Sequence, residues 1–163
     1  MLDLIIKNGQ CYIDGKLKHV DVSIKNGKIQ NIGQINDEAR DILDAVGLTV
    51  LPGCIDTQTH FREPGSTDTE DLHSGSRAAV AGGITAVFEM PNTNPPTSNK
   101  KEFQRKLSLA KNRMYCNYAF YFGATADNAS ELADLKNLEG CCGIKLFAGS
   151  STGNLLVADE KDI

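Results

Sequence analysis

Polar side chains that could do chemistry gather in one short stretch of the chain. Asp56, Gln58 and His60 alternate along a strand-like run. Because strand side chains alternate between two faces, these three point the same way. An acid, an amide and an imidazole inside a core need partners, and a metal ion or a bound substrate would serve all three. The pattern predicts a ligand site at this strand end; the alternative is a hydrogen-bonded structural histidine.

Two residues bring the chemistry of anion binding. Arg62 carries a planar fork of donors that matches a carboxylate. Asn92 brings an amide donor to the end of the next strand-like run. Together they predict a site for an anionic small molecule. The alternatives are a surface ion pair between Arg62 and Glu63, and a turn role for Asn92 among its neighbouring prolines.

Lys145 lies in an otherwise apolar run, residues 143–147. A buried ammonium tends to lose its proton, and the neutral amine is nucleophilic toward carbon dioxide or carbonyl groups. The alternative is a lysine whose stem is buried while its charged end reaches solvent. The polar loop of residues 150–153 gives a weak anion-binding signal, since no helix with phosphate-loop spacing follows it.

Other charged residues receive structural interpretations. Glu70 and Asp71 suit a helix N-terminus, and His73 suits a solvated helix position. No residue of the chain is assigned as the catalytic acid or base. A run of cationic residues is interpreted as the exposed face of an amphipathic helix: Lys100, Lys101, Arg105, Lys106, Lys111 and Arg113.

The elements that must position these side chains are βα units. After residue 52, apolar runs alternate with helical stretches, which is typical of a parallel sheet. Helices are expected over residues 70–81, after a Ser98 cap, and after Asn128. Four strands are expected, at residues 54–59, 84–89, 115–122 and 143–147. Four such units make half of a (β/α)8 barrel, whose chemistry lies at the strand C-termini, so residues 53–163 predict a truncated barrel.

Residues 1–52 predict a separate small β domain. Short strand-like runs occur at residues 4–7, 20–24, 28–32 and 48–51, and period-two alternation is clear in the second and third. Asn26-Gly27 supplies the positive φ angles of a tight hairpin. We expect a small antiparallel, β-sandwich-like unit, so the overall class is α/β.

Composition excludes several classes of protein. Hydrophobic residues make up 40% of the chain, charged residues 23%, and the net charge is -4. The scattered lysines form no basic stripe, so a nucleic-acid partner is not expected. No apolar run approaches the roughly 20 residues of a membrane span, which predicts a cytoplasmic protein. The five cysteines form no CxxC pair and are interpreted as reduced thiols.

Three segments together resemble the dihydroorotases of the amidohydrolase superfamily. The segments are residues 52–65 (PGCIDTQTHFREPG), 82–85 (GGIT) and 90–93 (MPNT). The resemblance covers essentially the whole chain. It implies a metal-dependent barrel in which His60 is a metal ligand, Lys145 is a carboxylated lysine bridging two metals, and Arg62 and Asn92 hold the substrate carboxylate.

The resemblance also implies an activity and a cofactor. The activity is the reversible cyclisation of N-carbamoyl-L-aspartate to L-dihydroorotate in pyrimidine biosynthesis. The cofactor is one or two zinc ions. Gln58 stands where the family has a histidine, and its amide oxygen is a weaker zinc donor than imidazole. Asp56 would support the ligands without binding metal, and the later ligands have no counterpart, so the chain alone is expected to be inactive.

Two rival functions remain. The first is a non-catalytic homologue that acts as partner or scaffold of another pyrimidine enzyme such as aspartate transcarbamoylase; Gln58 favours it, while Arg62, Asn92 and Lys145 oppose it. The second is an allantoinase-like cyclic ureide hydrolase, which residues 90–93 oppose. The expected partners are an anionic small-molecule substrate and either a second copy of the chain or aspartate transcarbamoylase.

Overall fold

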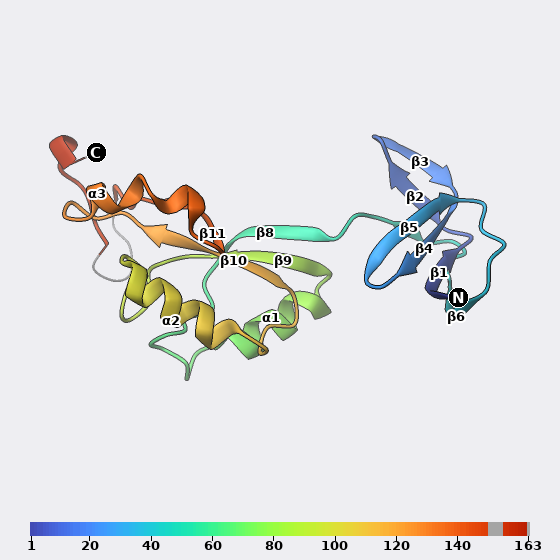
Figure 1. Ribbon diagram of the computed structural model, residues 1–163, viewed down its shortest axis with the longest axis horizontal. Coiled ribbons are helices and arrows are strands. Elements are labelled where there is room, and N and C mark those ends of the chain that lie inside the picture. Colours follow the sequence, from blue (N-terminus) through green and yellow to red (C-terminus); the bar gives the residue numbers. More distant parts are fainter. Residues whose placement is uncertain (150–154, 163) are drawn as a thin grey trace. The chain divides into compact units, whose positions relative to one another are not determined.

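The computed structural model describes residues 1–149 and 155–162, and the chain divides into two compact units. Unit 1 is Met1–Pro52 and unit 2 is Gly53–Ile163. Figure 1 shows the elements of both units along the chain. The polar loop of residues 150–153, which gave a weak anion-binding signal, lies outside the described residues. The candidate site is therefore built from the described residues of unit 2.

Unit 1 contains two small sheets. The Asn26-Gly27 hairpin is confirmed, because both residues have positive φ (52° and 71°) and Lys25 pairs with Lys28 across it. The sheets have the orders β5-β4-β1-β6 and β3-β2-β7. Their strands are β1 (Leu2–Lys7), β2 (Gln10–Ile13), β3 (Lys16–His19), β4 (Asp21–Lys25), β5 (Lys28–Gly33), β6 (Ala39–Asp44) and β7 (Thr49–Val50).

The expectation of a purely antiparallel unit was wrong. β6 runs parallel to β1, and β7 runs parallel to β2. After β5 the chain crosses to the far edge of β1 before it forms β6, and such a crossing produces a parallel pair. β3 was missed because all four of its residues are exposed, so no buried face imposes an alternating pattern.

Unit 2 holds a four-stranded parallel sheet in the order β11-β10-β9-β8. Neighbouring strands are therefore consecutive in the chain, as in a (β/α)8 barrel. The expected α/β class with the first half of a barrel is confirmed. The strands are β8 (Cys54–Thr59), β9 (Ile84–Glu89), β10 (Asn117–Gly123) and β11 (Cys141–Lys145).

The fourth strand begins and ends earlier than the apolar run of residues 143–147 suggested. β11 ends at Lys145, and Phe147 instead forms an isolated parallel bridge with Leu156. The Val157 N–H donates to the Phe147 carbonyl at 2.9 Å, and Val157 is buried. Hydrophobic residues beyond the strand therefore continue the packing that the sequence pattern assigned to the strand itself.

The helices start slightly later than expected because their N-caps differ. α1 (Leu72–Ala81) is capped by Asp71 in a reciprocal capping box with Ser74, so residue 70 lies before the helix. α2 (Lys100–Ala110) is capped by Asn99, not by Ser98. The third expected helix is one turn, α3 (Ala129–Leu132), followed by a 3-10 turn at residues 135–137.

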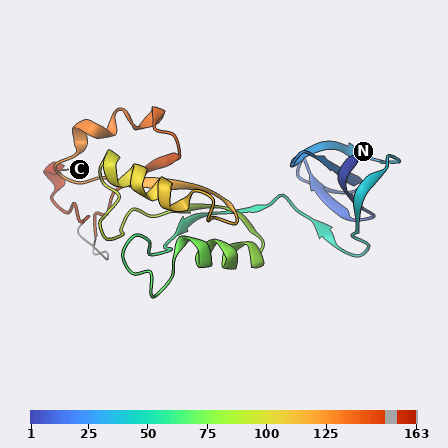
Figure 2. The ribbon, with the colours of Figure 1, turned by 60° about the horizontal axis from the view of Figure 1, so that its bottom comes forward.

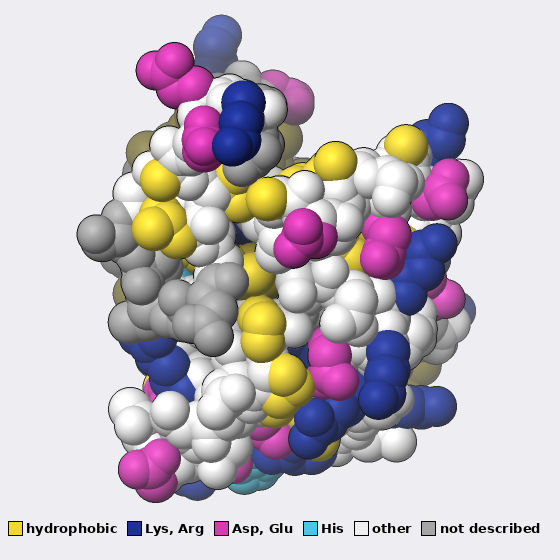
Figure 3. Space-filling model, turned by 90° about the vertical axis from the view of Figure 1, so that its left-hand side faces the viewer, with side chains coloured by type: hydrophobic (Ala, Val, Ile, Leu, Met, Phe, Trp, Pro, Cys, Tyr) yellow, Lys and Arg dark blue, Asp and Glu magenta, His cyan; other side chains and the backbone are white. Residues whose placement is uncertain are grey.

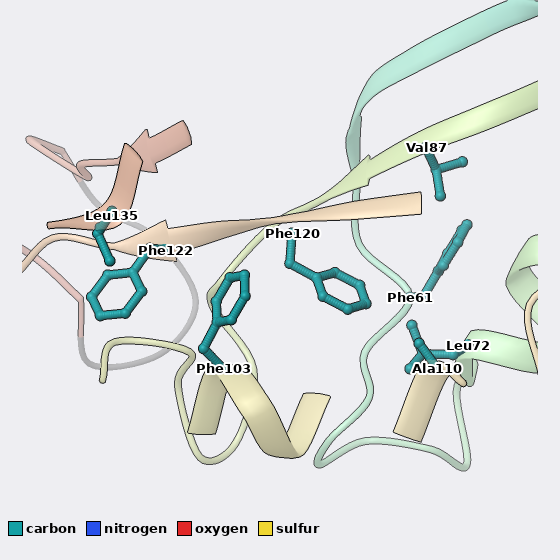
Figure 4. Close-up of a cluster of buried hydrophobic side chains, with 8 residues drawn as sticks. All are labelled: Phe61, Leu72, Val87, Phe103, Ala110, Phe120, Phe122 and Leu135. Atoms are coloured by element: carbon teal, nitrogen blue, oxygen red, sulfur yellow. The ribbon is translucent and has the colours of Figure 1, made fainter. Parts of the chain in front are cut away.

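α1 and α2 lie on one side of the sheet in both ribbon views (Figures 1 and 2). The core between the helices and the sheet is aromatic: the Phe103 ring centroid lies 6.3 Å from that of Phe120 and 6.1 Å from that of Phe122. Figure 4 shows the Phe103 ring between the rings of Phe120 and Phe122. The cluster consists of Phe61, Leu72, Val87, Phe103, Ala110, Phe120, Phe122 and Leu135.

The surface mixes charge types. Basic side chains (Lys or Arg) and acidic side chains (Asp or Glu) both occur on the face drawn in Figure 3, with hydrophobic side chains between them. Within the part of the chain that the structure describes, no helix is long and apolar enough to cross a membrane.

Candidate active site at the carboxyl ends of the strands

His60 is the centre of the candidate site. It follows the last residue of β8 and is half-buried. Its side chain is hydrogen-bonded to the side chain of Asn92, which lies in the loop after β9. Burial lowers the pKa of His60 below its ordinary value of 6.5, and the nearby charges of Arg62 and Lys145 lower it further, while the Asn92 hydrogen bond raises it. The imidazole is therefore neutral at pH 7.

Arg62 is held in an unusual backbone conformation. Its φ of 59° is in the left-handed region, which non-glycine residues seldom adopt. The Ser66 N–H donates to the Arg62 carbonyl at 3.1 Å, and the Asn94 N–H donates to the Pro64 carbonyl at 2.9 Å. The second bond joins the loop after β8 to the loop after β9, so Arg62 and Asn92 belong to one connected framework.

Glu63 points inward and does not form the surface ion pair with Arg62 that was considered as an alternative. Its carboxylate accepts from Arg113 Nη1 at 2.8 Å and from the Leu72 N–H at 2.9 Å. Arg113 also lies 3.5 Å from the Asp71 carboxylate. Arg113 was assigned to the exposed face of α2, and that assignment was wrong, because it anchors the loop that carries Arg62.

The loop after β9 is ordered by its own backbone. The Met90 N–H donates to the Thr59 carbonyl at 2.9 Å, which extends the pairing between β8 and β9 beyond the strands. The N–H groups of Thr93 and Thr97 both donate to the Pro91 carbonyl at 2.9 Å. Asn92 lies inside this turn, so its backbone serves the turn while its side chain reaches His60.

Lys145 is the last residue of β11, so it lies at the same end of the sheet as His60 and Asn92. It is half-buried, and its Nζ lies 5.0 Å from the centroid of the Phe147 ring. An ammonium over an aromatic face is a favourable contact. The charge is close enough to His60 to influence its pKa, but the lysine is not enclosed in an apolar strand as the sequence suggested.

Asp56 and Gln58 are not buried with His60, contrary to expectation. Both are exposed, and the Asp56 carboxylate accepts the backbone N–H of Gln58 at 2.9 Å. β8 is an edge strand of the sheet in the described chain, so its polar side chains meet solvent. The desolvation argument for a ligand shared by these three residues therefore applies to His60 alone.

A buried ion pair beneath the site was missed. Lys106 of α2 contacts the Glu89 carboxylate at the end of β9, and the two side chains are 0% and 1% exposed. Lys106 had been assigned to the exposed face of α2, and this was wrong. A signal was present in the sequence: Phe103, Lys106 and Ala110 lie three and four residues apart, so helical spacing places Lys106 on the apolar face.

Burial dominates the ionisation of this pair. It raises the pKa of Glu89 to about 7, and Lys106 opposes that rise. Burial also lowers the pKa of Lys106, against the influence of Glu89. The backbone N–H of Phe61, between His60 and Arg62, also opposes the rise in the pKa of Glu89.

The donors of the described residues fit a metal ion in part. His60 offers a neutral imidazole, the form that binds zinc. Gln58 offers an amide oxygen, and Lys145 an amine that would bind only after carboxylation. No group of three or more His, Cys, Asp or Glu side chains that could hold a metal ion occurs within residues 1–149 and 155–162. A metal ion held by these side chains would therefore need further ligands beyond those of the described residues.

The contacts of His60 predict two pKa changes of opposite sign. Arg62→Met should raise the pKa of His60 by removing a positive charge, whereas Asn92→Ala should lower it by removing a hydrogen bond. NMR titration of the His60 ring in the two variants measures both pKa changes; changes of the same sign would contradict the geometry.

The depressed pKa of His60 also links folding to pH. The stability contributed by neutral His60 is present above pH 6.5 and is lost as pH falls through the folded-state pKa.

Comparison with known proteins places this arrangement in a family. Residues 49–145 match the amidohydrolase family. The chain is 38% identical over 162 residues to a dihydroorotase of Methanosarcina acetivorans, covering 98% of the chain and 34% of the relative. It is 37% identical over 162 residues to an allantoinase of Escherichia coli, covering 99% of the chain and 36% of the relative.

Solved structures share the fold. An L-hydantoinase (dihydropyrimidinase) from Arthrobacter aurescens superimposes with a TM-score of 0.87 at 28% identity, covering 96% of this chain and 35% of that one. A D-hydantoinase superimposes with a TM-score of 0.82 at 32% identity, covering 99% and 36%. The chain thus spans about a third of the length of the relatives it matches. The family match over residues 49–145, together with the half-barrel and its strand-end site, shows that the chain belongs to the amidohydrolase family.

Proposed function

We propose that the chain carries the substrate-carboxylate and first metal contacts of a dihydroorotase-type cyclic amidohydrolase, acting between N-carbamoyl-L-aspartate and L-dihydroorotate. The observation that carries the proposal is the junction of the loops after β8 and β9. There a neutral His60 is hydrogen-bonded to Asn92, with Arg62 close enough to affect its pKa.

Arg62 and Asn92 suit a ligand that carries a carboxylate. A guanidinium can donate two parallel hydrogen bonds to one carboxylate, and an amide adds a further donor. L-Dihydroorotate has such a carboxylate next to its cyclic amide. Dihydrouracil has the same ring without the carboxylate. Comparison of these two ligands therefore isolates the contribution of Arg62 and Asn92, which we call the carboxylate clamp.

His60 would be a metal ligand, and Lys145 a second one in its carboxylated form. A bound zinc ion would supply a nucleophilic water near neutral pH and polarise the ring carbonyl. In this proposal Arg62 and Asn92 orient the ring by its carboxylate, and the loop framework keeps them in register with His60. Orientation of a reacting group contributes to catalysis by removing its rotational freedom before reaction.

Calorimetric titration with L-dihydroorotate, dihydrouracil and allantoin tests the clamp. Binding of L-dihydroorotate should be about tenfold tighter than binding of dihydrouracil, and Arg62→Met should remove that difference, a change of about 1.4 kcal/mol. Arg77→Met is the matched control, because Arg77 is an exposed arginine of α1. Equal affinities for the first two ligands would refute the carboxylate clamp.

The same titration separates the rival cyclic ureide hydrolase. The E. coli allantoinase is nearly as identical to this chain as the Methanosarcina dihydroorotase, so identity does not decide between them. Allantoin lacks a carboxylate. Tighter binding of allantoin than of L-dihydroorotate would replace the proposed substrate with a ureide.

Gln58 should limit metal content. Imidazole is a stronger zinc donor than an amide oxygen, and Gln58 is exposed and free to be replaced without disturbing the core. Gln58→His should therefore raise the zinc bound per chain after equilibration and dialysis, measured by elemental analysis. Gln104→His, an exposed change on α2, is the control. An increase as large in the control would mean that added histidine alone binds zinc.

A further inference from the structure

The buried pair formed by Glu89 and Lys106 contacts both loops of the candidate site. Lys106 Nζ contacts the Glu89 carboxylate and donates to the Met90 carbonyl at 2.9 Å. Met90 begins the turn that carries Asn92. The Phe61 N–H, between His60 and Arg62, interacts with the Glu89 carboxylate closely enough to lower its pKa. The ion pair therefore interacts with backbone groups on each side of the site.

The location of the pair is costly for folding. Both side chains are almost completely buried, and Lys106 also lies 5.2 Å from the centroid of the Phe120 ring in the aromatic core. Taking two charges out of water costs more than their attraction returns in many proteins, and apolar replacements of similar volume are often equally stable. Stability of the core alone therefore does not account for an ion pair at this place.

The directions of the contacts indicate another role. Lys106 comes from α2, whereas the groups that it and Glu89 hold belong to the ends of β8 and β9. An apolar pair could fill the same volume, but it could not donate to the Met90 carbonyl or attract the Phe61 N–H. The pair thus supplies polar contacts that packing cannot replace.

We infer that Glu89 and Lys106 are positioning residues, which hold the loops of His60, Arg62 and Asn92 at the spacing that a carboxylate ligand requires. The inference rests on the proposed function for the identity of the ligand. The spacing itself is a property of the two loops and can be measured without a ligand. A misplacement of a binding group by about 1 Å is enough to weaken a site greatly.

The test compares the double variant Glu89→Leu/Lys106→Met with the wild-type chain by three measurements. These are urea unfolding, the hydrogen-exchange rate of the Phe61 amide by NMR, and the dissociation constant for L-dihydroorotate. We expect unfolding close to wild type, since the apolar pair fills the same space. We expect Phe61 exchange to be roughly tenfold faster and binding about tenfold weaker. Unchanged exchange and unchanged binding would overturn the inference.

Glu89→Gln provides a second variant that preserves volume if the double variant does not fold. A carboxylate presents negative charge to both Lys106 and the Phe61 N–H, whereas the neutral glutamine side chain offers one acceptor oxygen and turns its NH2 group toward the other donor. Faster Phe61 exchange or weaker binding is expected. Lys101→Met, an exposed change on α2, is the matched control and should leave both unchanged.

The two proposals fail in different ways. If the wild-type chain does not bind L-dihydroorotate, the proposed ligand is wrong, and Phe61 exchange alone then decides whether the pair holds the loop. If the wild type binds and the double variant binds equally well with a protected Phe61 amide, the ligand stands and the positioning role is rejected.

Discussion

Replacing Phe103 with alanine should lower the free energy of unfolding by about 3–5 kcal/mol. Phe103 is 0% exposed and packs against Phe120 and Phe122, so the change removes a full ring from the centre of the cluster. The cavity would lie between α2 and β10, where few atoms can move to fill it. Urea or thermal unfolding followed by circular dichroism measures the loss.

Tyr115→Ala is the control for that measurement. Tyr115 is 57% exposed. Among the described residues, the only aromatic ring that contacts the Tyr115 ring is that of His73, which packs edge-on. Its removal should cost about 1 kcal/mol or less. A loss for Phe103→Ala no larger than for Tyr115→Ala would show that the aromatic cluster is not the stabilising core of unit 2.

Replacing Glu63 with alanine should be the second large change, with a loss of about 2 kcal/mol of unfolding free energy. The substitution leaves the Leu72 N–H at the start of α1 without its acceptor and removes the nearer of the two carboxylate partners of Arg113, the other being Asp71. Arg113 is partly exposed, so water compensates for part of the lost ion pair. The expected loss of unfolding free energy is therefore smaller than for a fully buried pair.

Glu63→Ala should also weaken ligand binding, because the loop that holds Arg62 loses its attachment to α1. Glu139→Ala, an exposed glutamate change, is the control and should alter neither stability nor affinity. If Glu63→Ala destabilises the protein but L-dihydroorotate binds with unchanged affinity, the carboxylate anchors the helix only and has no part in holding Arg62.

The location of the site could be predicted from the sequence because it depends on local patterns. The apolar runs, and the glycine and proline residues that flank them, predicted β8 and β9 at their observed bounds. Parallel strands end at one edge of a sheet, so His60, Arg62 and Asn92 were expected together, and the structure brings them together. Their chemical roles remain predictions that the experiments above test.

The contacts beneath the site could not be predicted in the same way, because they depend on distant segments. Lys106 and Arg113 looked like members of one cationic helix face, but each reaches a carboxylate from another part of the chain, Glu89 and Glu63. Sequence pattern assigns a side chain to a helix face only through its neighbours in the helix. A lysine paired on the buried face therefore resembles an exposed one until the opposing acid is located.

Burial along β8 was also mispredicted for a tertiary reason. Alternation predicted that Asp56 and Gln58 share one face, but the register of β8 with β9 shifts between Asp56 and Thr59, and burial of a face depends on what lies opposite it. In the described residues β8 is an edge of the sheet and both side chains are exposed. Period-two alternation fixes which side chains share a face and leaves the environment of that face undetermined.

The backbone of Arg62 has a consequence for how this position can vary. A left-handed φ of 59° costs an arginine about 1 kcal/mol or more that glycine would not incur. Glycine at position 62 would relieve this cost in the folded state, so the backbone conformation of the loop does not itself call for an arginine. The part that the guanidinium plays in the proposed site can therefore be separated from the stability of the fold. Arg62→Gly should accordingly yield a chain that folds at least as well as the wild type while it loses its affinity for a carboxylate.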